Sequence, residues 1–211
     1  MRLAFAPASN TEGKKDATGA FHPEARAWAQ FVGEAEVVRF DNTRGKVAQR
    51  SAVLSAICDA KNLSHLAFFC HGWTNGIQPG ITTSDLNAVA AAVELASPLV
   101  DLVVTLYCCS TGGGGIGGDG GFADEFRDAL CRRGVTRCVV DAHVTPGHTT
   151  QNPHVRRFMG AGTEYGGAGG QWIVSPGSPL WPRWRAALRT TDLRFEFPTF
   201  SLEQIHARLA R

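Results

Sequence analysis

Two residues with the chemistry of a base and a nucleophile each follow an apolar stretch of the chain. His71 comes directly after residues 66–70 (LAFFC), and Cys109 ends the stretch that begins at Leu102. A free thiol has a pKa near 8.5, and a nearby imidazole or other cation lowers that pKa and makes the thiolate available as a nucleophile. The two residues therefore predict nucleophilic catalysis by Cys109 with His71 as its base, provided that the fold brings them together.

The stretches before these residues are typical of buried strands. Residues 102–107 (LVVTLY) and 66–70 are apolar almost without alternation, as in a strand that is covered on both faces of an α/β sheet. The carboxyl ends of parallel strands meet at one edge of the sheet, where ligand crevices form. The glycine-rich residues 112–121 after Cys109 predict a tight turn or a close approach of the backbone. A flexible surface loop is the alternative.

Strand-like and helix-like segments alternate over most of the chain, which predicts an α/β fold with a mostly parallel central sheet flanked by helices, in a single domain over residues 1–211. Residues 72–85 are expected to be loop and residues 145–170 an irregular insertion. The expected strands are 2–6, 36–40, 66–70, 102–107, 137–144 and 171–174, and the expected helices are 22–31, 44–61, 85–96, 122–133, 181–188 and 201–209.

Composition argues against several classes of partner. The formal net charge is +2 in 211 residues, and the basic residues are mostly scattered, so a nucleic-acid partner is not expected. Arginines and tryptophans do mix near residues 181–194, but an amphipathic helix explains that pattern as well as base stacking does. No apolar run reaches the roughly 18 to 20 residues of a membrane helix, and the start of the chain reads as a strand. We therefore expect a cytoplasmic protein without a membrane or cofactor.

Six cysteines lie within expected helices and strands and not at the spacings of a disulfide framework, so reduced thiols are expected. Free cysteine is among the most buried residue types, and burial is therefore expected for four of the six: Cys58, Cys70, Cys131 and Cys138.

The order of these elements resembles a known family. An apolar strand ending in His71-Gly72, one helix, and an apolar strand ending in a small residue and Cys109 are similar to the His-Gly and Ala-Cys signature of caspase-like (clan CD) cysteine peptidases. Cys109, Ser110, Thr111 and Gly112 resemble the Cys-Glu-Thr-Gly ending of CHAT domains, with Cys108 in the small-residue position. The resemblance covers roughly residues 1–144.

The resemblance implies a caspase-like sandwich and the hydrolysis of peptide bonds in a protein or peptide substrate. It implies that His71 is the general acid and base, that Cys109 is the nucleophile, and that the backbone N–H groups of Gly72 and Cys109 stabilise the oxyanion. Cys108 is then the less favoured nucleophile.

The insertion supplies further candidates. Asp141, His148 and Asn152 are expected to contribute polar side chains to the substrate cleft, and Asp141 or Asn152 could orient His71 as the third member of a triad. Together with His143 and His154, Asp141 and His148 are residue types that zinc accepts, but they lack a recognised spacing, and we assign no metal site. The candidates for the residues that select the substrate are the acids Asp16, Asp119 and Asp141 and the arginines Arg156 and Arg157.

Two other functions remain open. A catalytically inactive caspase-like domain would serve as a binding or scaffold module. A serine α/β-hydrolase would use Ser110, with residues 71–73 (HGW) as its oxyanion loop, but the first glycine of the GxSxG elbow is missing.

Overall fold

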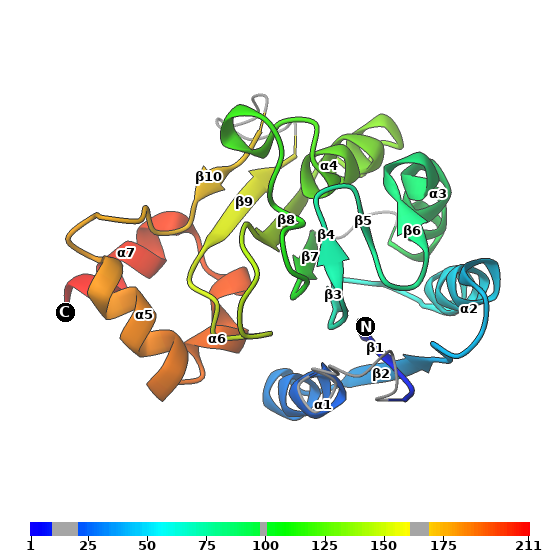
Figure 1. Cartoon of the computed structure of the whole chain (residues 1–211), viewed down its shortest axis with the longest axis horizontal. Coiled ribbons are helices and arrows are strands. Elements are labelled where there is room, and N and C mark those ends of the chain that lie inside the picture. The colour runs from blue at the N-terminus through cyan, green and yellow to red at the C-terminus, as the bar shows by residue number, and fades with distance from the viewer. Residues whose placement is uncertain (10–20, 98–100, 161–168) are drawn as a thin grey trace.

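The computed structural model describes residues 1–9, 21–97, 101–160 and 169–211 (Figure 1). Its central sheet has seven strands in the order β10-β9-β8-β7-β3-β1-β2. The strands from β2 to β8 in this order are parallel, whereas β9 is antiparallel to β8 and β10 is antiparallel to β9. The strands are β1 (Arg2–Pro7), β2 (Ala35–Phe40), β3 (His65–Phe68), β7 (Leu102–Leu106), β8 (Cys138–His143), β9 (Val155–Met159) and β10 (Gln171–Trp172).

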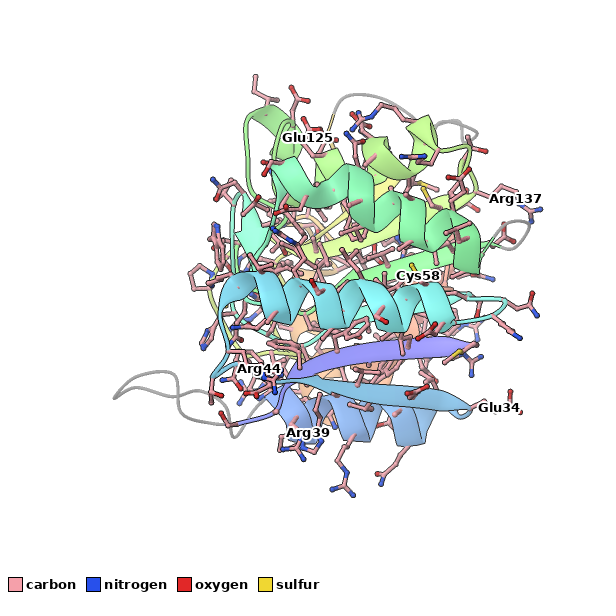
Figure 2. All side chains as sticks on the ribbon, turned by 90° about the vertical axis from the view of Figure 1, so that its right-hand side faces the viewer. Glu34, Arg39, Arg44, Cys58, Glu125 and Arg137 are labelled. Carbon is pink, nitrogen blue, oxygen red and sulfur yellow. The ribbon has the colours of Figure 1, made fainter. Side chains whose placement is uncertain are left out.

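Helices cover both faces of this sheet, and each face has its own apolar core. On one face α2 (Lys46–Asp59), α3 (Leu86–Ala96) and α4 (Phe122–Arg132) lie side by side (Figure 2). On the other face lie α1 (Phe21–Val32), α5 (Trp181–Thr190), α6 (Leu193–Glu196) and α7 (Leu202–Ala210). The mostly parallel α/β arrangement expected from the sequence is confirmed. No helix within the described ranges is long and apolar enough to cross a membrane.

Two segments differ from the expectation. Residues 72–85 are not plain loop, because they contain a small antiparallel sheet of β4 (Gly72–Trp73), β5 (Gly76–Ile77) and β6 (Ile81–Thr82), followed by a 3₁₀ turn. The insertion at 145–170 contains β9, which pairs with the full length of β8 except its first residue. Strands β4, β5 and β6 have two residues each and are too short to show a periodicity in the sequence. Strand β9 is largely buried, but its two arginines make its sequence look polar.

The prediction for the cysteines is partly wrong. Cys70 and Cys138 are buried, Cys131 is half-buried, and Cys58 is exposed near the end of α2, on the outer side of that helix (Figure 2). Cys58 is therefore the most exposed of the six thiols, whereas Cys109 and Cys131 are partly exposed.

Candidate active site

The register of two neighbouring strands brings His71 and Cys109 to the same edge of the sheet. β3 and β7 are parallel, with Phe68 opposite Leu106. The pairing of side chains continues past the strand ends, because the rings of Phe69 and Tyr107 stack with centroids 4.5 Å apart. The next residues, Cys70 and Cys108, have their Sγ atoms 3.5 Å apart. His71 and Cys109 are the next pair in this register.

Alternation of side chains decides which face the pair occupies. Cys70 and Cys108 belong to the core beneath α2, α3 and α4, whereas Phe69 and Tyr107 belong to the core beneath α1 and α5. Successive residues of a strand point to opposite faces, so His71 and Cys109 are expected on the α1 side. The contact of the His71 ring with Phe21 of α1, edge to face at 4.8 Å between centroids, agrees with this placement.

Gly72, the residue after His71, is packed closely against the segment that carries Cys109. A Cβ atom at this position would lie 2.7 Å from Cys108 Cβ, 2.9 Å from the carbonyl oxygen of Cys109 and 2.9 Å from Thr111 Cγ2. Such distances leave room for glycine alone. His71 accepts a hydrogen bond at its carbonyl oxygen from Gln78, so the following pair of the hairpin, Gly72 and Ile77, is of the non-hydrogen-bonded kind. The N–H of Gly72 therefore points away from β5, as a donor to an oxyanion must.

The two adjacent cysteines have different environments. Cys108 is fully buried, its Sγ lies 3.3 Å from the carbonyl oxygen of Phe68, and burial together with the neighbouring Cys70 thiol raises its pKa well above the usual range. Cys109 is partly exposed, and its thiol contacts the carbonyl oxygen of Gly147 at 4.0 Å. A substrate can reach Cys109 but not Cys108.

The residue after Cys109 has an unusual backbone. Ser110 has a φ of 61°, a left-handed conformation that is uncommon outside glycine, asparagine and aspartate. At this turn the chain leaves the direction of the preceding strand and continues into the glycine-rich residues. A nucleophile elbow would pass directly from the turn into a helix, whereas here Gly112–Gly121 separate Ser110 from α4.

The glycine-rich residues fold against themselves and are not an extended flexible loop. The N–H of Gly115 donates to the carbonyl oxygen of Asp119 at 2.8 Å, and a Cβ at Gly121 would lie 1.7 Å from the carbonyl oxygen of Gly113. The close backbone approach that the glycines predict is therefore confirmed, and it occurs within the loop itself.

The loop delivers the start of α4 to both strand ends. The first N–H groups of this helix, those of Phe122 and Ala123, donate to the carbonyl oxygens of Thr74 and Thr111 at 2.8 and 3.0 Å. Thr74 follows β4 and Thr111 follows Cys109 and Ser110. The helix start thus ties together the two segments that carry His71 and Cys109, and these two donors are occupied by backbone.

Residues 145–154 form a hydrogen-bonded loop next to Cys109. The side-chain amide of Asn152 donates to the carbonyl oxygen of Thr145 at 2.8 Å, and its amide oxygen accepts from the N–H of His154 at 3.1 Å. Thr150 Oγ1 donates to Glu24 of α1 at 2.8 Å. The loop beside Cys109 is thereby attached to the helix whose Phe21 packs on His71.

A cavity of about 660 Å³ lies between this loop and α5. It begins at Gly147, the residue in contact with Cys109. Its lining residues are Thr145, Pro146, Gly147, His148, Gln151, Asn152, Pro153, His154, Trp181, Arg185 and Arg189.

Two of the three predicted substrate-binding residues, His148 and Asn152, line this cavity, and the third, Asp141, does not. Asp141 is fully buried, and its two carboxylate oxygens accept hydrogen bonds from Arg157 at 2.8 Å each. Burial raises the pKa of Asp141, and Arg157 opposes that shift. Asp141 and Arg157 pair with each other in the core and cannot contact substrate. Neither residue is therefore retained as a candidate for selecting the substrate.

The remaining sequence candidates are dispersed. Asp119 is exposed in the glycine-rich loop, and Asp16 lies outside the described residues. Arg156 lies over the Trp172 ring at 4.5 Å, and burial lowers its pKa. Neither Asp141 nor Asn152 makes a described contact with His71, so neither of these two candidates is placed as the third member of a triad.

His143, His148 and His154 influence one another but are not placed as ligands of one metal ion. His143 is fully buried against the Tyr107 ring, and burial, with smaller effects of His148 and His154, lowers its pKa to about 3. The ring of His154 contacts the rings of Trp172 and Trp181, with centroids 6.4 and 5.0 Å apart. Among the residues that the structure describes, no group of three or more histidine, cysteine, aspartate or glutamate side chains is placed to hold a metal ion.

Sequence reasoning missed Phe21, Gly147, Arg185 and Arg189. The two arginines are spaced by one helical turn, which is the signal that could have placed them on one face. Phe21 and Gly147 reach the site through tertiary contacts that leave no local pattern. No protein-family model, curated protein or solved structure matches the chain.

Proposed function

We propose that the protein is a cysteine peptidase in which His71 and Cys109 form the catalytic dyad. The observation that carries the proposal is the register of β3 and β7, whose last side-chain pairs are Phe69 with Tyr107 and then Cys70 with Cys108. The following pair is the histidine and the one partly exposed cysteine of this edge. The strand, helix and strand on which the resemblance to caspase-like peptidases depends are present as β3, α3 and β7.

The residues can perform each step of peptide hydrolysis. His71 takes the thiol proton, and the Cys109 thiolate attacks the carbonyl carbon of the scissile bond. The N–H groups of Gly72 and Cys109 receive the oxyanion, a contribution often worth a few kcal/mol. His71 then gives its proton to the departing amine, and water attacks the thioester with His71 again as the base.

A catalytically silent binding module is the second candidate, and one observation favours it. No hydrogen bond joins the His71 ring to the Cys109 thiol in the described part of the chain, where the thiol contacts Gly147. Catalytic hydrogen bonds are often long before substrate binds, so a working dyad does not require this contact in the free protein.

Alkylation rates distinguish the two functions. Iodoacetamide at pH 7, read by peptide mass spectrometry, should label Cys109 at least about tenfold faster than the exposed Cys58, which serves as an internal standard. His71→Ala should reduce the Cys109 rate to that of Cys58 and leave Cys58 unchanged. Equal rates at Cys58 and Cys109 in the unsubstituted protein would contradict the dyad and favour the silent module.

A further inference from the structure

We propose that the cavity beside Cys109 binds an acidic side chain of the substrate, a specificity that rests on the proposed peptidase function. Four of the residues that line the cavity are arginine or histidine, and none is an aspartate or glutamate. The four are His148, His154, Arg185 and Arg189. A cavity with one sign of charge selects a ligand of the opposite sign.

Arg185 and Arg189 lack the hydrogen-bonding and ion-pair partners that several other arginines of the described residues have. Both are exposed on α5, one turn apart, and neither makes a hydrogen bond or ion pair within the described ranges. By contrast, Arg50 pairs with Asp85 at 2.6 Å and Arg194 with Glu24 at 3.7 Å. Like charges one turn apart destabilise a helix slightly, and a bound carboxylate removes that cost.

The guanidinium group also suits this ligand better than an ammonium group does. Its planar set of N–H donors matches the two oxygens of a carboxylate, and such charge-assisted hydrogen bonds are stronger than neutral ones.

His148 adds a donor on the opposite wall of the cavity. Its Nδ1 accepts hydrogen bonds from the N–H groups of Thr150 and Gln151 at 3.2 and 3.3 Å. A neutral imidazole that accepts at Nδ1 carries its proton on Nε2, so the remaining ring nitrogen is a donor. The loop backbone thereby fixes the tautomer that can bind a carboxylate.

The position of the cavity relates it to the cleaved bond. The carbonyl oxygen of Gly147 contacts Cys109 Sγ, and Gly147 is also part of the cavity wall. A peptide whose carbonyl carbon is attacked by Cys109 therefore has the cavity next to it, within reach of a side chain at or beside the cleaved bond. The volume of about 660 Å³ is ample for an aspartate or glutamate side chain.

The first test measures cleavage. Fluorogenic peptides that carry aspartate, glutamate, lysine or leucine at and next to the cleaved bond are compared by kcat/KM. The expected result is a preference for the acidic peptides, reduced about tenfold by either Arg185→Ala or Arg189→Ala. The double variant Arg185→Glu/Arg189→Glu should prefer lysine. Arg132→Glu/Arg211→Glu, which makes the same change of charge at exposed positions outside the cavity, should keep the original preference.

The second test measures binding without cleavage. Fluorescence anisotropy with Cys109→Ala protein should show that a labelled glutamate peptide binds more tightly than its glutamine analogue, and that Arg185→Glu/Arg189→Glu in this background abolishes the difference. Cleavage without an acidic preference would overturn the assignment of the cavity and leave the dyad in place. Arginine-dependent binding of the acidic peptide without any cleavage would support the cavity and overturn the peptidase. Neither cleavage nor binding would overturn both.

Discussion

The Sγ atoms of Cys70 and Cys108 lie 3.5 Å apart within the core, and each of these residues directly precedes a member of the proposed dyad. The contact fixes the alignment of β3 and β7 beyond their last paired residues. It also means that two of the three cysteines at this edge are packing residues, because both are fully buried.

The adjacent cysteines should therefore respond differently to substitution. Cys108→Ala removes a buried sulfur and should lower the free energy of unfolding by about 1 to 2 kcal/mol. It should leave fast alkylation at Cys109, whereas Cys109→Ala should abolish it with little effect on stability. Urea denaturation and peptide mass spectrometry on the two variants measure both properties. These different roles of Cys108 and Cys109 would be contradicted if Cys109 were unreactive and the fast labelling occurred at another cysteine and disappeared on Cys108→Ala.

Gly72→Ala should damage the site from the other strand end. The new Cβ would lie under 3.0 Å from Cys108, Cys109 and Thr111, two of these contacts being with side chains and one with a backbone oxygen. We expect a loss of about 1 to 3 kcal/mol in stability and a large drop in the alkylation rate of Cys109.

Gly45→Ala is the matched control for this substitution. Gly45 has a φ of −61°, and no atom lies within 4 Å of an added Cβ. Its cost should stay within about 1 kcal/mol, since it changes only an N-cap residue. If both alanine variants behaved alike, the close packing of Gly72 on the Cys109 segment would not matter to the site.

The sequence could predict this edge because its signals are local. Continuous apolar residues before His71 and before Cys109 indicate buried strands, and the alternation of strands and helices indicates their parallel order. The small sheet at 72–82 and strand β9 could not be predicted in the same way. The small sheet consists of two-residue strands that pair with one another and are too short to carry a pattern. Strand β9 forms by pairing with β8, where Arg157 is buried opposite Asp141.

The backbone at Ser110 gives a prediction that also tests the serine hydrolase. Its φ of 61° is costly for a residue with a side chain, so Ser110→Gly should stabilise the protein by up to about 1 kcal/mol. Ser110→Ala should retain peptide cleavage, because Cys109 and not Ser110 is the proposed nucleophile. Cleavage of ester reporters that survives Cys109→Ala and disappears in Ser110→Ala would instead identify the hydrolase.

The buried pair of Asp141 and Arg157 predicts an asymmetric response. Arg157→Met leaves a carboxylate in the core without its partner and should cost about 3 to 5 kcal/mol in the free energy of unfolding. Arg157→Met/Asp141→Asn should recover part of that loss, although the carbonyl oxygen of Phe197 still loses its donor. Urea titrations of the single and double variants measure the difference, and equal costs would show that the unpaired carboxylate is not the cause.

Two buried histidines should make the protein less stable as the pH falls. Burial lowers the pKa of His65 to about 4 and that of His143 to about 3. In the unfolded chain both titrate near 6.5, so below that pH the unfolded state takes up protons that the folded state does not. Each residue should lower the free energy of unfolding by up to about 1.4 kcal/mol per pH unit, from about pH 6.5 down to its folded pKa. The raised pKa values of Asp124 and Asp141 act in the opposite direction at the acid end.

The quantity to measure is therefore the difference in the free energy of unfolding between the unsubstituted protein and His143→Gln. Urea denaturation at several pH values from pH 7 to pH 4 gives this difference. That difference should shift in favour of the variant as the pH falls, and a difference independent of pH would show that His143 is protonated in the folded protein as readily as in the unfolded chain.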